Sequence, residues 1–537
     1  MFGLNKDKDK EKREKIGKAQ IRGAVEVLKK YKSAKAPLER RILEEEKWFR
    51  LRHWEIFSNS VEQERIKPVS AWMFNSIANK HADAMDNYPE PNVLPREKGD
   101  EESAELLSKI LPVIIENNNF EKTYSDSWWY KLKHGTSAYG VFWNNLRGES
   151  GDIDITRLDL LNIFWEPGIS DIQESENLFL VRLENNSVLK SRYPHLTNKD
   201  LSPDTQLGIS AYDENQDMSE KSAVIDWYYK REQEGKTVLH YCKFVGDAVL
   251  FATENDPEFK DKGLYDHGMY PVVFDSMYPL EGTPAGFGLI SIMKSPQMYI
   301  DRLNQVILEN SVMSSKVRYF AKEGGGINES EFLDWSKPIV HVEGSLNEER
   351  LRKIEAPTVS GNVLGVLEMK IDELKETSGN RDFSQGSTSS GVTAAAAIAA
   401  LQEAGNKTSR DVLSSSYRAY TNISYLIIEL VRQFYDETRV FRITGEDGKF
   451  EYINFVPFKD DGASLFDVVI KPQKKSSYSK LSQNELAKEM YKLGFFQPGN
   501  SKQALAAIEI MDFDGKAQVK EEIRRIAREV DKKQNNA

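Results

Sequence analysis

The chain has very little cysteine, little histidine and no long apolar run. Its 537 residues include one cysteine, Cys242, which excludes a disulfide framework and any Cys-rich zinc module. The seven histidines never recur at the spacing of metal ligands, so we expect no zinc site. The longest purely apolar run, Ala394–Leu401, is far shorter than the roughly 20 residues that span a bilayer. We therefore expect no association with a membrane.

The chain also lacks a basic excess and any enzyme signature. It carries 73 Lys and Arg against 84 Asp and Glu, a net charge of −11, whereas a sequence-independent DNA coat is expected to be basic. Neither a P-loop nor a G-x-S-x-G motif occurs, and Gly286-Phe287-Gly288 lacks the P-loop lysine. The N-terminus is charged from Lys6 onward, which is unlike a secretory signal. We predict no cofactor and no enzymatic activity.

Two groups of residues could bind a metal ion or nucleic-acid bases, but a structural role is favoured for both. Asp152 and Asp154 would share one face of a predicted strand, which is suitable geometry for two ligands of a divalent cation. Such pairs are common on solvated strands, so a metal site is not the favoured interpretation. Trp128-Trp129-Tyr130 could stack on bases, but on a helix two of the three must face the core, so packing is favoured.

The first half of the chain predicts helices followed by strands. Apolar residues between Leu38 and Phe57 recur at three- and four-residue steps and give one helical face. Further helices are predicted over about 70–87, 102–116 and 120–134, the last capped by Gly135. The period then changes to two, which predicts strands over 138–144, 152–158, 177–183, 223–232 and 236–251, the last folded about Gly246-Asp247.

The second half predicts two helices that flank a small insert. A bend over Gly282–Gly288 precedes a helix to about Tyr319, in which Ser295-Pro296 is either an N-terminal cap or a kink. The insert, about 322–357, has one strand-like run at Pro338–Val342. A second helix covers Val363–Thr377. A polar Gly/Ser loop comes next and leads into a very long helix, Val392–Thr438. The rest of the chain predicts strands over 439–444, 452–456 and 466–471. Helices are predicted over 480–492, 501–511 and 516–533.

This order of parts resembles the portal proteins of tailed double-stranded DNA bacteriophages. Local strings carry the same resemblance: Trp128-Trp129 with His134-Gly135, Gly286-Phe287-Gly288 with Gln297 and Asp301-Arg302-Leu303-Asn304, and Gly379-Asn380-Arg381-Asp382 with Gly391-Val392-Thr393-Ala394. The resemblance covers most of the chain. It implies a mainly helical α+β fold with a wing, paired stem helices, a clip insert and a helical crown.

The resemblance also implies a function and a division of the chain. A portal is a ring, usually of twelve subunits, at one capsid vertex, through which a terminase motor packages DNA and through which the DNA later leaves. The implied parts are a charged arm (1–19), wing (20–284 and 392–480), stem helices (285–321 and 358–379), clip (322–357), tunnel loop (380–391) and crown (481–537). The implied partners are double-stranded DNA in transient, sequence-independent contact, the terminase large subunit, a head-to-tail adaptor, and the major capsid and scaffolding proteins. The implied location is the virion, after assembly in the host cytoplasm.

Three sets of residues follow from this division. The tunnel loop would present small polar groups that make weak, exchangeable contacts with phosphate, together with one acid and one aromatic residue: Asp382, Phe383, Ser384, Gln385, Ser387, Thr388, Ser389 and Ser390. Cations near the stem would offset repulsion in the channel: Lys294, Lys316, Arg318 and Lys322. Acidic residues of the clip would form a docking face for basic partners: Glu329, Glu331, Asp334, Glu343, Glu348 and Glu349.

Two other classes of function remain open at this point. One is a metal-dependent DNA-processing enzyme that uses Asp152 and Asp154, and the other is a scaffold or adaptor built on the long helix without a channel. Rings with a central hole in electron micrographs would separate a portal from both.

Overall fold

The computed structural model describes most of the chain in two compact units. The described residues are 15–57, 65–97, 100–148, 150–201, 212, 220–233, 235–315, 318–321, 328–334, 339, 341, 343, 351–354, 360–379, 407–444, 450–455, 466–474, 487–497, 500–510, 519–525 and 528. One unit comprises Met1–Asp83 and Pro91–Ile470, and the other comprises Ala84–Glu90 and Lys471–Ala537.

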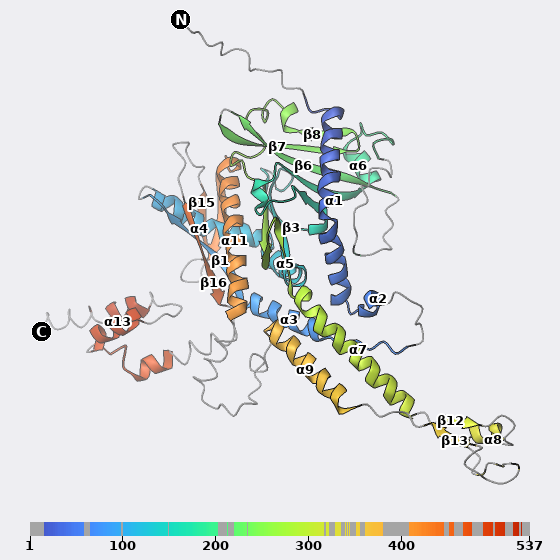
Figure 1. Cartoon of the computed structure of the whole chain (residues 1–537). Coiled ribbons are helices and arrows are strands. Elements are labelled where there is room, and N and C mark those ends of the chain that lie inside the picture. Colours follow the sequence, from blue (N-terminus) through green and yellow to red (C-terminus); the bar gives the residue numbers. More distant parts are fainter. Residues whose placement is uncertain are drawn as a thin grey trace, which may run out of the picture. The chain divides into compact units, whose positions relative to one another are not determined.

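Helices and strands alternate irregularly along the chain (Figure 1). The helices are α1 (Lys18–Phe49), α2 (His53–Phe57), α3 (Trp72–Met85), α4 (Glu101–Asn117), α5 (Phe120–His134), α6 (Asn186–Arg192), α7 (Leu289–Ser315), α8 (Glu329–Leu333), α9 (Gly361–Ser378), α11 (Lys407–Phe434) and α13 (Ser501–Ile510). The strands are β1 (Asn87–Pro95), β2 (Thr136–Asn144), β3 (Asp152–Leu158), β4 (Ile163–Trp165), β5 (Asn177–Asn185), β6 (Lys221–Gln233), β7 (Lys236–Val245), β8 (Ala248–Ala252), β9 (Val272–Ser276), β10 (Tyr278–Leu280), β11 (Thr283–Phe287), β12 (Arg318–Ala321), β13 (Leu351–Ile354), β14 (Arg439–Thr444), β15 (Phe450–Phe455) and β16 (Phe466–Lys474).

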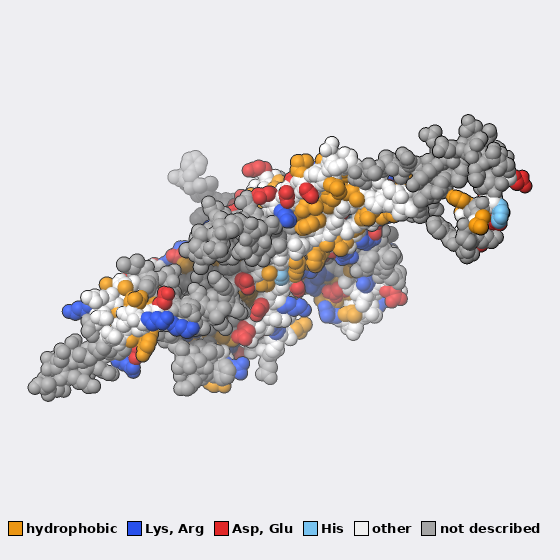
Figure 2. Space-filling view, turned by 90° about the horizontal axis from the view of Figure 1, so that it is seen from below, with side chains coloured by type: hydrophobic (Ala, Val, Ile, Leu, Met, Phe, Trp, Pro, Cys, Tyr) orange, Lys and Arg blue, Asp and Glu red, His pale blue; other side chains and the backbone are white. Residues whose placement is uncertain are grey.

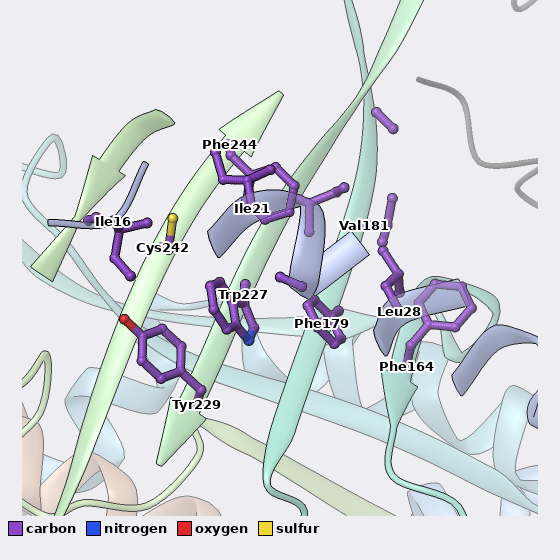
Figure 3. Close-up of a cluster of buried hydrophobic side chains, with 14 of the residues drawn as sticks. Ile16, Ile21, Leu28, Phe164, Phe179, Val181, Trp227, Tyr229, Cys242 and Phe244 are labelled. Carbon is purple, nitrogen blue, oxygen red and sulfur yellow. The ribbon is translucent and has the colours of Figure 1, made fainter. Parts of the chain in front are cut away.

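The largest sheet is antiparallel, with the order β4-β5-β6-β7-β8, and α1 covers one of its faces (Figure 3). The register brings Phe179 opposite Trp227 and Trp227 opposite Cys242, so alternate residues of three strands face α1. Ile21 and Leu28 of α1 pack on this layer. Burial raises the pKa of the Cys242 thiol to about 12, so this cysteine is a core residue and not a nucleophile.

A three-stranded antiparallel sheet, β3-β2-β9, packs against two helices of the same unit. Both α5 and α11 pack against it, and Phe120 of α5 contacts Tyr420 of α11 and Tyr139 of β2. The amphipathic pattern of α11 explains its position, because Tyr420, Ile427 and Val431 are all buried while Arg418 on the other side is exposed.

Several elements lie where the sequence predicts them. Helices α4 and α5 match, and Gly135 caps α5 in the left-handed conformation with a φ of 84°. Strands β7 and β8 form the predicted hairpin about Gly246-Asp247. The Trp128-Trp129 pair packs as expected, since Trp128 is 2% exposed and Trp129 stacks on His81 with ring centroids 4.1 Å apart.

Other elements correct the predictions. The pattern from Leu38 to Phe57 is two helices, because Leu51 takes a φ of 58° between α1 and α2. The predicted bend over Gly282–Gly288 contains β11, which pairs with β10. Helix α7 begins before Pro296 and continues through it, so Ser295-Pro296 is not a helix start. It ends at Ser315, four residues before Tyr319, because β12 follows.

The long helix is also shorter than predicted where it is described. Helix α11 ends at Phe434 and not at Thr438, since Asp436–Thr438 lead into β14, and residues 392–406 lie outside the described part of the chain. The strand predicted at Pro338–Val342 lies largely outside it as well. Strand β1 was not predicted, because the prolines at 89 and 91 argue against a strand. Among the described strands it pairs with β16 alone, in a two-stranded sheet that tolerates these prolines.

Candidate functional site

Helices α7 and α9 lie side by side, and the small insert connects them at one end (Figure 1). Ser360 caps α9 by accepting a hydrogen bond from the amide of Asn362, and Gly379 ends it with a φ of 70°. Strand β12, directly before the insert, pairs antiparallel with β13 inside it, and Asn328 caps the short helix α8 of the insert. The two helices therefore form a hairpin that carries the insert at its tip.

Glycines allow the start of α7 to approach the end of α5 backbone to backbone. A Cβ on Gly288 would lie 2.6 Å from the amide nitrogen of Gly135 and 2.6 Å from the carbonyl oxygen of Lys133. A Cβ on Gly135 would lie 2.0 Å from the carbonyl carbon of Phe287. Two of the strings that carried the resemblance, His134-Gly135 and Gly286-Phe287-Gly288, are thus in direct contact.

We expect Gly288→Ala to lower the thermal unfolding midpoint because its Cβ would collide with backbone atoms that cannot move aside. The loss should exceed about 1 kcal/mol. Gly23→Ala is the matched control, since a Cβ at that position in α1 meets nothing within 4 Å and alanine favours the helix. Equal midpoints for the two variants would show that the close approach of α5 and α7 contributes nothing to stability.

Charged side chains surround this contact and tie α1 to α5 and α7. Lys133 Nζ lies 2.6 Å from Glu46 Oε2, and His134 Nδ1 lies 3.1 Å from Glu45 Oε2. Burial alone would raise the pKa of Glu46, but the hydrogen bond from His134 and the charge of Lys133 outweigh it and lower that pKa. Ser291 of α7 donates to Glu45 as well. Glu46 therefore stays ionised, and the contacts of Glu45 and Glu46 hold α5 and α7 against α1.

A short segment, Arg65–Ser70, runs along α7 and is held there by hydrogen bonds with polar side chains of the helix. Gln297 donates to the carbonyl of Ser70 at 2.9 Å, and Asp301 accepts from its amide at 3.0 Å. One turn on, Gln305 donates to the carbonyl of Ile66 at 2.8 Å. Arg65 then pairs with Glu309 through two hydrogen bonds of 3.1 Å. Donors and acceptors alternate along the helix, so only one register satisfies them all.

The pair His53–Asp301 is fully buried in this arrangement. The Nδ1 atom of His53 lies 2.5 Å from Asp301 Oδ2, and its Nε2 lies 3.0 Å from the carbonyl oxygen of Trp48. Both ring nitrogens therefore face oxygen atoms, and the buried pair links α2 to α7.

A second buried charge, Lys131, anchors α11. Its ammonium group lies 2.6 Å from Asp275 Oδ1 of β9 and within 2.7 Å of the hydroxyls of Ser415 and Ser416 on α11. Asp275 accepts in turn from Ser416 at 2.6 Å. Burial lowers the pKa of Lys131 and the charge of Asp275 opposes that shift, which favours a buried ion pair.

The helix pair exposes apolar side chains on two different sides. On α9 the least exposed residues repeat at three- and four-residue steps and mark the side packed on α7: Leu367, Ile371, Leu374 and Ser378. Met369, 56% exposed, lies roughly opposite. On α7, Leu308 (43% exposed) and Val312 (40%) follow Asp301 at helical spacing. They therefore lie on the face of α7 that binds Arg65–Ser70, beyond the end of that segment. Figure 2 shows hydrophobic side chains along the stretch that leads to the insert.

Helix α9 also carries an exposed row of carboxylates. Glu368, Asp372 and Glu376 follow one another at four-residue spacing and are all exposed. Like charges at this spacing destabilise a helix by about 0.2–0.5 kcal/mol per pair, so the row does not serve the helix's own stability.

The predicted stem and loop residues are only partly described. Lys294 lies 3.3 Å from Glu44 of α1, at the base of α7. Arg318 begins β12, whereas Lys316 and Lys322 lie outside the described residues. All eight predicted residues of the tunnel loop also lie outside them: Asp382, Phe383, Ser384, Gln385, Ser387, Thr388, Ser389 and Ser390. These assignments stay predictions.

The acidic residues of the insert have different surroundings. Glu329, Asp334 and Glu343 are exposed, while Glu331 accepts hydrogen bonds from the backbone and ring of His341 at 2.9 and 2.8 Å. Glu331 therefore stabilises the insert as well as contributing charge. Glu348 and Glu349 lie outside the described residues.

Asp152 and Asp154, the candidate metal ligands, are engaged by protein groups. The Tyr435 hydroxyl donates to Asp152 at 2.7 Å, and Arg147 lies 3.3 Å from Asp154. Within the described residues there is no group of three or more His, Cys, Asp or Glu side chains placed to hold a metal ion. No helix in the described part is long and apolar enough to cross a membrane.

Comparison with known proteins gives one family. The model of the phage P22-like portal protein family matches residues 65–278 and 237–537, which is most of the chain. No curated protein matches the sequence.

Proposed function

Because the chain belongs to the phage P22-like portal protein family, we propose that it forms a closed ring at one capsid vertex, through which DNA is packaged and later ejected. The family is structural, and we propose no reaction for this chain. Its proposed location is the virion, with assembly in the host cytoplasm. Twelve subunits is the proposed number.

The observation that carries the proposal is the pair of exposed apolar surfaces on α7 and α9. A ring with rotational symmetry needs two different patches on each copy, which meet head to tail. Leu308 and Val312 form one patch, and Val366 and Met369 form the other, on different sides of one helix pair. We propose that the first patch of one copy packs on the second patch of the next, which repeats the helix pair around an axis.

We propose that the carboxylate row of α9 faces the channel. Each copy would add Glu368, Asp372 and Glu376 to rings of negative charge around the axis. DNA phosphates are repelled by such rings, so the duplex can move without the salt-dependent binding that phosphate neutralisation would give. The proposed tunnel loop, 380–391, follows α9 directly. Four cations remain candidates for reducing the repulsion between the channel and DNA phosphate: Lys294, Lys316, Arg318 and Lys322.

We propose that the insert docks the terminase large subunit and then a head-to-tail adaptor. Its exposed Glu329, Asp334 and Glu343 would steer basic segments of those partners. Contacts with major capsid and scaffolding proteins are proposed for the wing, 20–284 and 392–480.

Deletion of residues 325–353 is expected to abolish binding of terminase or adaptor and to leave rings intact. The insert follows α7 and precedes α9 in the chain, so the two helices can be joined directly once it is removed. Pull-down with the purified partner measures binding, and negative-stain images measure assembly. Rings that fall apart in the deletion variant would make the insert an assembly element instead.

A further inference from the structure

The C-terminal part of the chain has the opposite charge to the rest. Residues 471–537 carry 14 Lys and Arg against 9 Asp and Glu, whereas residues 1–470 carry 59 against 75. A charge asymmetry of this kind indicates a partner of its own for the basic part. The basic part coincides with the second compact unit, apart from the short segment Ala84–Glu90.

Five of these cations stand at a strict four-residue spacing: Lys516, Lys520, Arg524, Arg528 and Lys532. Residues 519–525 and 528 are helical, and Ile523 packs in a small core with Ala504 and Ile508 of α13. At about 100° per residue, Lys520, Arg524 and Arg528 form one stripe whose centre lies about 100° around the helix from Ile523. Lys516 and Lys532 lie outside the described residues, and their spacing extends the stripe in sequence.

The described cations of this unit reach the surface. Arg524 and Arg528 are exposed, as are Lys492 and Lys502, and Figure 2 shows several blue side chains on the part that contains α13. Lys520 pairs with Glu509, and Arg524 lies 3.5 Å from Glu521. Such exposed ion pairs contribute about 0–1 kcal/mol, so a phosphate can replace the carboxylate at little cost.

We propose that this stripe binds the phosphate backbone of double-stranded DNA, independently of sequence. A row of guanidinium and ammonium groups along one helix face matches the regular charge of a duplex, and arginine can contact phosphate through two hydrogen bonds. The proposal rests on the proposed function, since a portal is the setting in which this chain meets DNA. It assigns attraction to the C-terminal unit and repulsion to α9, so the two contacts are separate.

The test measures the affinity of the full-length protein for a labelled duplex of about 30 base pairs. Fluorescence anisotropy reports this affinity at salt concentrations between about 50 and 200 mM. Lys520, Arg524 and Arg528 are changed together to Gln. The control changes Lys29, Lys30 and Arg40 to Gln, which removes three exposed cations of α1. The stripe variant should lose on the order of tenfold in affinity, and its salt slope should fall by about 0.9 for each phosphate that the protein no longer neutralises. The control should match the wild type.

Equal affinity and equal salt slope for the stripe variant and the wild type would overturn the proposal. So would an equal loss in both variants, because binding would then follow total charge and not the stripe. Negative-stain images of the same samples keep this result separate from the proposed function. Rings without stripe-dependent binding would refute only the DNA contact, and an absence of rings in the wild type would refute the portal assignment.

Discussion

Val312→Glu and Met369→Glu, each made alone, are expected to abolish ring formation. Each places a carboxylate in one of the two apolar patches that we propose to meet between copies. Burial of an unpaired charge costs several kcal/mol, and the reduced burial of apolar surface adds about 1.5–3 kcal/mol. Since each 1.4 kcal/mol is tenfold in affinity, the interface should weaken by more than about a hundredfold. Mass photometry or analytical ultracentrifugation would report monomers.

A mixture of the two variants tests whether the two patches join head to tail. Val312→Glu leaves the α9 patch intact and Met369→Glu leaves the α7 patch intact, so one copy of each can still join. The mixture should give dimers and no rings, as a head-to-tail interface between unlike patches requires. Val188→Glu on α6 is the control, since Val188 is 44% exposed and lies outside both patches. Rings in either single variant would show that these patches do not mediate assembly.

Lys131→Ala should have the largest effect on stability. It would leave Asp275 as a buried carboxylate without its cation, which typically costs about 3–5 kcal/mol. Hydrogen exchange should also become faster in α11, because Lys131 bonds to Val412, Ser415 and Ser416 on that helix. Thermal unfolding together with hydrogen exchange measures both effects.

The double variant Lys131→Met with Asp275→Leu tests the physical reason. Replacing both charges by apolar groups of similar size removes the desolvation cost, so most of the lost stability should return. If Lys131→Ala alone is as stable as the wild type, the ion pair does not hold α11. If the double variant is as unstable as the single one, the hydroxyls of Ser415 and Ser416 carry the interaction instead.

Periodicity predicted the elements that local sequence controls. The apolar spacing of α5 and the glycine after it sufficed for both the helix and its end, and Gly246-Asp247 sufficed for the β7–β8 hairpin. Periodicity gave the wrong helix boundaries at two places. The end of α1 has Leu51 in the left-handed region and is closed by local backbone hydrogen bonds, among them Arg52 N–H to the carbonyl of Lys47, but no glycine marks it in the sequence. Helix α7 continues through the buried Pro296, although a proline inside a helix normally favours a break.

The candidate site was predictable in layout and not in detail. The order helix, insert, helix is visible in the sequence, and so is the four-residue spacing of Glu368, Asp372 and Glu376. The hydrogen bonding of Arg65–Ser70 to α7 has no sequence signal, because side chains of α7 bind mainly the backbone of the segment. The bond of Lys131 to Asp275 joins residues 144 positions apart, which single-sequence reasoning cannot pair.

The central claim is that this chain closes into a ring whose channel is lined by the α7–α9 helix pair. Cryo-electron microscopy of the purified full-length protein tests it most directly. We expect closed rings with an axial hole, α7 of one copy against α9 of the next, and Glu368, Asp372 and Glu376 facing the hole. Particles without a hole, open filaments, or rings in which these carboxylates face outward would contradict it.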